Sequence, residues 1–342
     1  MSRTKGAELG TRTATETPPS DSVSGLACLS DAQVTIVGLG LMGGSLAGAL
    51  RGRCRRVVGV ARRPETTEAA VARSLVDQAT GDLAGAVSQA DIVVLATPVR
   101  VILRQIPEIG PLLPAGCLLM DLGSTKAEIV SAMADLPPHV QPLGGHPMCG
   151  KEKSGIEVAD PALYHGRTFI LSPLPRTSER ALALGKALVQ AAGANPLVID
   201  GERQDSLVAT ISHLPYLLAC ALVRTADATT SADPLVWKIV AGGFRDTSRV
   251  AGSDVTMMID ILLTNREQVL RALDVCVGQM KELREFVASG DEGRLRAELG
   301  AVRETRKMML LAAVICVNLV ATIPYSPSTV WAIGRRRRPR PT

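Results

Sequence analysis

The sequence contains very few aromatic residues. Phe, Tyr and Trp together make up 2% of its 342 residues, and they are scattered along the chain. Proteins that bind single-stranded nucleic acid without sequence preference stack the bases on several aromatic side chains of one surface. The sequence therefore predicts no nucleic-acid partner of this kind.

Cysteine and histidine are also scarce and dispersed. The seven cysteines include no C-x-x-C pair, and the four histidines form no H-E-x-x-H arrangement. An odd number of widely spaced cysteines argues against a disulfide framework and a cysteine-rich zinc module, and indicates a reducing compartment. The N-terminal segment lacks the apolar region of a secretory signal. These absences predict a cytoplasmic protein without a metal site.

An excess of positive charge is missing from most of the chain. The formal net charge is +5, and no acidic residue follows Glu304. The last residues contain as many arginines as this excess, so residues 1–334 are neutral overall. The charge therefore gives no reason to expect a nucleic-acid partner for the body of the protein. These arginines are Arg335, Arg336, Arg337, Arg338 and Arg340.

The segment before the arginines, residues 308–323, is nearly all apolar. Its 16 residues are fewer than the roughly 20 that a membrane-spanning helix needs. Two interpretations of residues 308–342 stay open. They form a terminal dimer-interface helix with a solvated basic end, or a short membrane anchor whose arginines contact lipid headgroups.

The apolar pattern divides the rest of the chain into three parts. Residues 1–32 are rich in Ser, Thr, Gly and Pro, which predicts a disordered arm. Residues 33–200 alternate short apolar strands with helical stretches, which predicts an α/β Rossmann-type fold with a doubly wound parallel sheet. Residues 201–307 predict an all-helical dimerisation domain, because their broad apolar faces need a partner. We expect strands at 34–37, 56–60, 92–96, 118–122, 140–143, 169–171 and 197–199, a helix at 41–50, and later helices at 203–229, 234–241, 254–289 and 292–306.

A glycine-rich motif follows the first predicted strand and opens the first helix. In a G-x-G-x-x-G motif, the first glycine permits a tight turn, the second lets a pyrophosphate approach the backbone, and the third packs helix on strand. The helix N-terminus then faces the anion. The sequence therefore predicts a dinucleotide site formed by Gly38, Leu39, Gly40, Leu41, Met42 and Gly43.

The end of the second predicted strand bears on which nucleotide binds. An NAD enzyme usually carries an acidic residue near Ala61, whereas this chain has Arg62 and Arg63. A guanidinium suits a 2′-phosphate, so NADP is favoured over NAD, although both arginines could simply point into water. Thr97 and Ser124 follow two further strands, at the carboxyl ends where ligands bind in such sheets.

Four further motifs extend this pattern. They are Asp121-Leu122-Gly123-Ser124-Thr125-Lys126, the segment from Gly144-Gly145-His146-Pro147 to Gly155, Ser212-His213-Leu214-Pro215, and Gly243-Phe244-Arg245-Asp246-Thr247-Ser248-Arg249. With the glycine motif and in this order, they resemble the prephenate/arogenate dehydrogenase family over about residues 33–307.

This resemblance implies an oxidative decarboxylation in tyrosine biosynthesis, with a small cyclohexadienol as the substrate. Prephenate would give 4-hydroxyphenylpyruvate, and arogenate would give tyrosine. By position in the motifs, His146 would accept the hydroxyl proton and Ser124 would hydrogen-bond the same hydroxyl. Arg249 would hold a substrate carboxylate, since a guanidinium binds one through two hydrogen bonds. His213 would shape the substrate site, Glu152 would lie near its entrance, and Asp246 would orient an arginine.

The chain also departs from the family pattern. Many members have His-Asp where this chain has Gln204-Asp205, and many prephenate-type members have Trp at the position of Met258. These departures leave prephenate and NADP-dependent arogenate oxidation both open. Two other functions also stay open. One is a β-hydroxyacid dehydrogenase, with Lys238 or Lys281 as the nearest candidates for its catalytic lysine. The other is a non-catalytic NADP-binding sensor or membrane-tethered scaffold, against which the set Ser124, His146 and Arg249 speaks.

Overall fold

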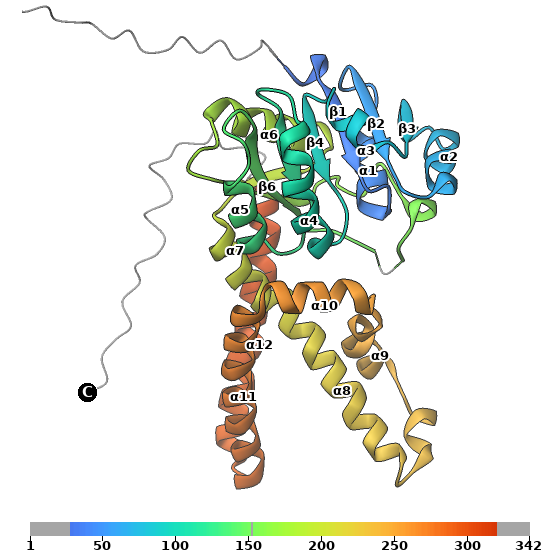
Figure 1. Ribbon diagram of the computed structural model, residues 1–342. Coiled ribbons are helices and arrows are strands. Elements are labelled where there is room, and N and C mark those ends of the chain that lie inside the picture. The colour runs from blue at the N-terminus through green and yellow to red at the C-terminus, as the bar shows by residue number, and fades with distance from the viewer. Residues whose placement is uncertain (1–27, 152, 320–342) are drawn as a thin grey trace, which may run out of the picture.

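The computed structural model describes residues 28–151 and 153–319, which form a sheet-based half followed by a helical half (Figure 1). Within these residues the eight strands pair in the order β3-β2-β1-β4-β5-β6-β7-β8. This order winds outward in two directions from β1 and β4, which confirms the Rossmann-type fold class. The strands are β1 (Gln33–Val37), β2 (Arg56–Val60), β3 (Gln78–Thr80), β4 (Ile92–Leu95), β5 (Leu118–Asp121), β6 (Gln141–Pro147), β7 (Thr168–Pro173) and β8 (Asn195–Val198).

The sheet is mostly parallel, as predicted, and one pair of neighbouring strands departs from this pattern. Strand β7 runs antiparallel to β6, with His146 opposite Ile170, whereas the other neighbouring pairs are parallel. A parallel neighbour needs a crossover connection, usually a helix. The described residues between β6 and β7 contain only the short 3-10 helix η3 (Ile156–Val158), so the chain turns back beside β6.

Helices cover both faces of the sheet and form two apolar cores. The first core packs α1 and α6 against the strands, and the second packs α4 and α5 against the other face. The inner strands are buried on both faces; all five residues of β1 are buried. The elements are η1 (Leu29–Asp31), α1 (Leu41–Leu50), α2 (Pro64–Ala72), α3 (Leu83–Val87), α4 (Val99–Ile109), η2 (Gly110–Leu112), α5 (Ala127–Ala134) and α6 (Glu179–Ala191).

The helical half begins with one long helical run. Helix α7 (Gly201–Val208), the π-helical turn η4 (Ala209–His213) and α8 (Leu214–Thr230) follow one another without a break. By length and composition the run Gly201–Thr230 could cross a membrane, although core helices pass the same test. The remaining elements are η5 (Pro234–Lys238), α9 (Gly242–Ser248), η6 (Arg249–Gly252), α10 (Val255–Thr264), α11 (Arg266–Ser289) and α12 (Glu292–Leu319).

The helix predicted over residues 254–289 is two helices. The backbone leaves the helical region at Asn265, at φ −124° and ψ 31°, and this residue separates α10 from α11. As a result, α10 lies beneath α4, while α11 runs away from the sheet, α12 returns alongside it, and α8 diverges from both (Figure 1). The side chain of Asn265 contacts Asp205 and His213 at this point.

Helix α12 continues past residue 307, where the sequence predicts a change of domain. Residues 1–27 and the arginines after residue 334 lie outside the described residues. The predicted arm and the two interpretations of the basic tail therefore stay predictions.

Candidate active site

The predicted dinucleotide motif lies at the point where the strand order reverses, between β1 and β4. Gly38 has φ +102°, and a Cβ there would lie 2.9 Å from the backbone of Ala96. A Cβ at Gly43 would lie 1.9 Å from the Gly38 carbonyl oxygen, so the third glycine is required by packing. A Cβ at Gly40 would meet nothing within 4 Å, and Gly40 is the N-cap of α1. This open helix N-terminus fits a dinucleotide pyrophosphate.

The other predicted nucleotide contacts border the same crevice. Thr97 follows β4, and its hydroxyl donates a hydrogen bond to Gln105 at 2.7 Å. Its methyl carbon would lie 2.9 Å from a Cβ at Gly38, so it forms one wall of the glycine turn. Arg62 and Arg63 follow β2 and are both exposed, and Arg63 is the N-cap of α2. Both guanidinium groups are therefore accessible to a bound dinucleotide.

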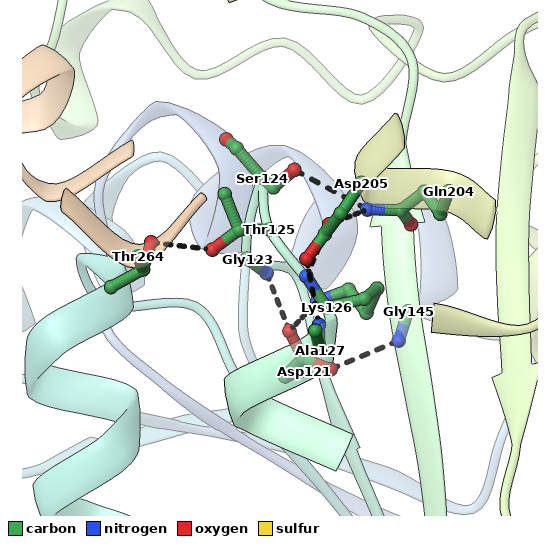
Figure 2. A network of polar contacts seen from close by, with 10 residues as sticks. All are labelled: Asp121, Gly123, Ser124, Thr125, Lys126, Ala127, Gly145, Gln204, Asp205 and Thr264. Atoms are coloured by element: carbon green, nitrogen blue, oxygen red, sulfur yellow. Dashed lines mark hydrogen bonds and ion pairs between the residues drawn. The ribbon is translucent and has the colours of Figure 1, made fainter. Parts of the chain in front are cut away.

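A buried ion pair supports the loop that carries Ser124. Lys126 and Asp121 are both fully buried, and the Lys126 ammonium contacts the Asp121 carboxylate. The same carboxylate accepts hydrogen bonds from the backbone N–H of Gly123 at 2.7 Å and of Gly145 at 2.9 Å (Figure 2). Burial raises the pKa of Asp121 and lowers that of Lys126, while their mutual attraction favours both charged forms. The pair joins the end of β5 to the strand that carries His146.

Two glycines bring His146 to this position. A Cβ at Gly145 would lie 2.4 Å from the Asp121 carbonyl oxygen, and one at Gly144 would lie 3.1 Å from the Lys126 side chain. Only glycine at position 145 allows β6 to pass this close to the end of β5, and Gly144 leaves room for the buried lysine. The Gly-Gly-His-Pro motif is part of β6, which extends beyond the strand predicted at 140–143.

His146 is buried, with 9% of its surface exposed, and it is neutral. Burial, the positive charge of Lys126 and the nearby His213 together lower its pKa to about 3, and the side chain of Gln204 partly opposes them. Its Nδ1 atom is buried with no hydrogen-bond partner among the described residues. A neutral imidazole of this kind can accept a proton from a ligand.

His213 lies in the same site, since its charge affects the pKa of His146. It is 1% exposed, and burial lowers its own pKa to about 4. Its Nδ1 atom lies 3.3 Å from the side-chain nitrogen of Asn265, which also donates a hydrogen bond to the Asp205 carbonyl at 2.8 Å. The start of α11 therefore holds a histidine of the preceding helical run.

Asp205 connects the two halves of the chain. Its carboxylate accepts hydrogen bonds from the backbone N–H of Lys126 at 2.7 Å and of Ala127 at 2.8 Å, which caps the N-terminus of α5 (Figure 2). A second connection lies nearby, where the hydroxyls of Thr125 and Thr264 are 2.8 Å apart. The loop that carries Ser124 is thus held from the helical half on two sides.

Several predicted residues lie outside this cluster or outside the described residues. Glu152 lies outside the described residues. Asp246 on α9 and Arg249 on η6 are exposed, and both elements pack against α8. Lys238 on η5 and Lys281 on α11 are also exposed. The roles assigned to Glu152, Asp246 and Arg249 therefore stay predictions.

Sequence reasoning gave no role to four residues of the network: Lys126, Gln204, Asp205 and Asn265. Lys126 and the Gln204-Asp205 pair stood in or beside quoted motifs, but no motif marks Asn265. A polar residue that ends an apolar helical stretch was the only available signal. Met258 is buried, whereas its neighbour Met257 is exposed.

Comparison with known proteins matches both halves of the chain. A family model described as prephenate dehydrogenase, nucleotide-binding domain, matches residues 46–198, and one described as prephenate dehydrogenase, dimerization domain, matches residues 200–301. The prephenate dehydrogenase of Bacillus subtilis strain 168 is 33% identical over 310 residues, which cover 88% of this chain and 83% of the relative.

Solved structures agree with these matches. The prephenate dehydrogenase of Aquifex aeolicus, in complex with hydroxyphenyl propionate and NAD+, has a TM-score of 0.77 at 32% identity, covering 82% of this chain and 99% of that chain. Synechocystis arogenate dehydrogenase has a TM-score of 0.72 at 30% identity, covering 81% of this chain and 99% of that chain. The resemblance seen in the motifs is confirmed, and this chain belongs to the prephenate dehydrogenase family of nicotinamide-dependent oxidoreductases.

Proposed function

We propose that this chain catalyses the oxidative decarboxylation of prephenate to 4-hydroxyphenylpyruvate. The observation that carries the proposal is the buried, neutral His146 beside the Ser124 loop, next to a crevice that fits a dinucleotide. Arogenate is the second candidate substrate, because the Synechocystis arogenate dehydrogenase matches 81% of this chain.

The proposed reaction needs one proton acceptor, and His146 supplies it. The bound nicotinamide would accept the hydride from the carbinol carbon. His146 takes the hydroxyl proton as that carbon becomes a carbonyl. The ring carboxylate then leaves as carbon dioxide, the ring becomes aromatic, and His146 returns the proton to the phenolic oxygen. No proton is gained or lost overall, so the imidazole finishes the cycle neutral.

Three further side chains orient the substrate in this proposal. Ser124, which is partly exposed at the end of the β5 loop, hydrogen-bonds the substrate hydroxyl and lies beside the nicotinamide. His213 borders the site from the helical half, and Arg249 binds a substrate carboxylate as a permanent charge. Glu152 near the entrance and Asp246 beside the arginine complete the proposed set.

The test is a spectrophotometric assay that crosses prephenate and arogenate with NAD and NADP. We expect reduction with prephenate, and we expect His146→Asn to lower kcat by about 10²–10⁴-fold, the usual contribution of a general base. Dinucleotide affinity, measured by calorimetry, should stay unchanged in that variant. Reduction in none of the four combinations would refute the function, and normal turnover of the variant would refute the role of His146.

The proposal favours NADP over NAD. Arg62 and Arg63 are exposed at the end of β2, where the ribose of a bound dinucleotide lies in such folds. Replacing both with alanine should raise the KM for NADP and leave the KM for NAD nearly unchanged. An equal effect on both cofactors would show that the arginines do not contact the 2′-phosphate.

We also propose a homodimer, formed by the helical half in the cytoplasm. Helix α11 exposes a stripe of apolar side chains at positions that share one helix face: Leu270, Val277, Met280, Leu283 and Val287. A helix face of this kind needs a covering surface. The matched family model is described as a dimerization domain, which favours a second copy of this chain as the cover.

A further inference from the structure

We infer that two amide side chains, Gln204 and Asn265, hold the two site histidines in opposite tautomers. His146 carries its proton on Nδ1, so its Nε2 accepts a proton. His213 carries its proton on Nε2, so it donates a hydrogen bond. The inference concerns the same site as the proposed function, but it describes the protonation of the ligand-free protein.

The orientation of the Gln204 amide follows from its neighbours. Gln204 is fully buried, and its nitrogen donates hydrogen bonds to the Ser124 carbonyl at 3.4 Å and to the Asp205 carboxylate at 3.2 Å (Figure 2). A carbonyl and a carboxylate only accept hydrogen bonds. The amide nitrogen must therefore face them, and the Gln204 oxygen Oε1 must point to the other side.

Gln204 also lies close to His146, since its side chain raises the pKa of that ring. Oε1 of Gln204 and Nδ1 of His146 are both buried without a hydrogen-bond partner among the described residues. Because Oε1 can only accept, the matching state of Nδ1 is N–H. An unpaired buried polar group costs about 1–3 kcal/mol, so pairing these two atoms removes two such penalties. Nε2 of His146 is then unprotonated and free to act as a base.

Asn265 favours the opposite tautomer at His213, because it donates a hydrogen bond to the ring. Its nitrogen Nδ2 donates a hydrogen bond to the Asp205 carbonyl at 2.8 Å, which fixes the amide orientation by the same reasoning. The second hydrogen of Nδ2 points to Nδ1 of His213, 3.3 Å away, and Nδ1 must be the acceptor. The proton of the neutral ring is therefore on Nε2.

Asp205 anchors both amides, through its carboxylate for Gln204 and its backbone carbonyl for Asn265. Asp205 thus fixes the orientation of both amides. Lys126 is the buried positive charge near this site. Two neutral histidines with the same tautomer would offer a ligand hydroxyl two acceptors or two donors. Opposite tautomers offer one acceptor and one donor, which matches a group that both gives and receives a hydrogen bond. Gln204 and Asn265 are therefore positioning residues.

The direct test is ¹⁵N NMR of the full-length, ligand-free protein with labelled histidine at pH 7. The chain has only four histidines, and His139 and His165 are exposed. His146→Gln and His213→Gln assign the two buried rings, and ¹⁵N shifts separate protonated from unprotonated ring nitrogens. We expect the Nδ1–H form for His146 and the Nε2–H form for His213. The Nε2–H form of His146 in the unmodified protein would overturn the inference, whether or not the protein oxidises prephenate.

Variants separate the two amides, and each serves as the control for the other. Gln204→Met removes the acceptor, so the Nδ1–H form of His146 should decline while His213 stays unchanged. Gln204→Glu restores an acceptor, so it should recover the Nδ1–H form and shift the pH profile of kcat/KM upward. Asn265→Asp should move the His213 proton to Nδ1 without affecting His146. A change in both rings from either variant would indicate a general structural effect and refute the assignment.

The tautomer of His146 should affect kcat, because this residue is the proposed base. Gln204→Met should lower kcat by roughly 10–100-fold, the range found when the hydrogen-bond partner that orients a metal-bound histidine is removed. The KM for the dinucleotide should not change. An unchanged kcat alongside a changed tautomer would refute the positioning role of Gln204.

Discussion

The two halves of this chain treat their apolar residues differently. Of the large apolar side chains that are exposed among the described residues, only Val71, Leu112 and Leu197 lie before residue 200, and the rest lie in the helical half. The sheet half buries its apolar residues on both faces of the strands, in two cores of its own. The helical half docks to the sheet half at α10 and at the start of α11, where Met258, Ile261 and Val269 are buried, and then extends away from it (Figure 1).

This comparison shows that the first half completes its own fold, whereas the second half needs an additional surface. Exposed apolar area of this extent is typical of an interface. The candidate active site lies where the halves meet, so its polar residues are buried by contacts within one chain. Four predictions test this division.

The largest effect is expected for the buried ion pair of the sheet half. Lys126→Met leaves the Asp121 carboxylate buried without its cation, which should lower the free energy of unfolding by about 3–5 kcal/mol. Urea denaturation measures it. Lys151 is the control, because it pairs with Asp160 at 3.0 Å on the surface, and Lys151→Met should cost less than about 1 kcal/mol. The double variant Asp121→Asn/Lys126→Met should recover much of the loss, and equal costs for the two lysines would contradict the buried pair.

A charge on the exposed stripe of α11 tests the helical half. Val277→Asp should weaken the dimer by at least about 100-fold, or about 2.8 kcal/mol, because a symmetric interface receives the substitution twice. Sedimentation velocity at a series of concentrations measures this. Val71 on α2 has nearly the same exposure, 50% against 49% for Val277, so Val71→Asp should leave the dimer intact. If both variants sediment alike, this face of α11 is not the interface.

The pH dependence of stability tests the buried histidines. The pKa of His146 is lowered to about 3 in the fold and is about 6.5 when unfolded, so between these values the unfolded chain binds the extra proton. Stability should therefore fall as pH drops below about 6.5, and His146 should contribute up to about 1.4 kcal/mol per pH unit. His146→Gln should show a shallower fall in urea denaturation at pH 4–7. Identical slopes would mean that His146 is not buried in its neutral form.

The smallest effects are expected for helix N-caps, which should contribute equally to stability in the two halves. Asp82 accepts a hydrogen bond from the Gly85 N–H at 3.0 Å at the start of α3, and Asp200 accepts one from Arg203 at 2.8 Å at the start of α7. Replacing either with alanine should cost about 1 kcal/mol, since helix caps are local. A much larger cost at Asp200 would show that the cap also supports the junction between the halves.

Local sequence features predicted the elements of the sheet half closely. The helix at 41–50 and the strand at 56–60 were predicted to the residue, because an apolar run between glycine or polar residues marks each. The strand β3, at Gln78–Thr80, was missed because it is short and not apolar. The strand β7 was predicted at 169–171, but its antiparallel direction was not, since strand direction depends on the connection that follows β6.

The candidate site was predicted in part, because some of its residues belong to local motifs and others act through distant contacts. His146, Ser124 and His213 belong to local motifs, so they could be found without a fold. Gln204 and Asn265 could not, because they act through hydrogen bonds to residues distant in the sequence. His213 and Asn265 are 52 positions apart, and the Gln204 amide reaches Ser124 across 80.

The sequence by itself determined the family, and it predicted the nucleotide site and the residues of the proposed chemistry, because these depend on residue identity within short segments. The tertiary structure alone decided that His146 is neutral, because burial and the nearness of Lys126 are properties of packing. It also decided which atoms of His146 and His213 face the amides. A histidine has two ring nitrogens, and only its neighbours in space determine which one carries the proton.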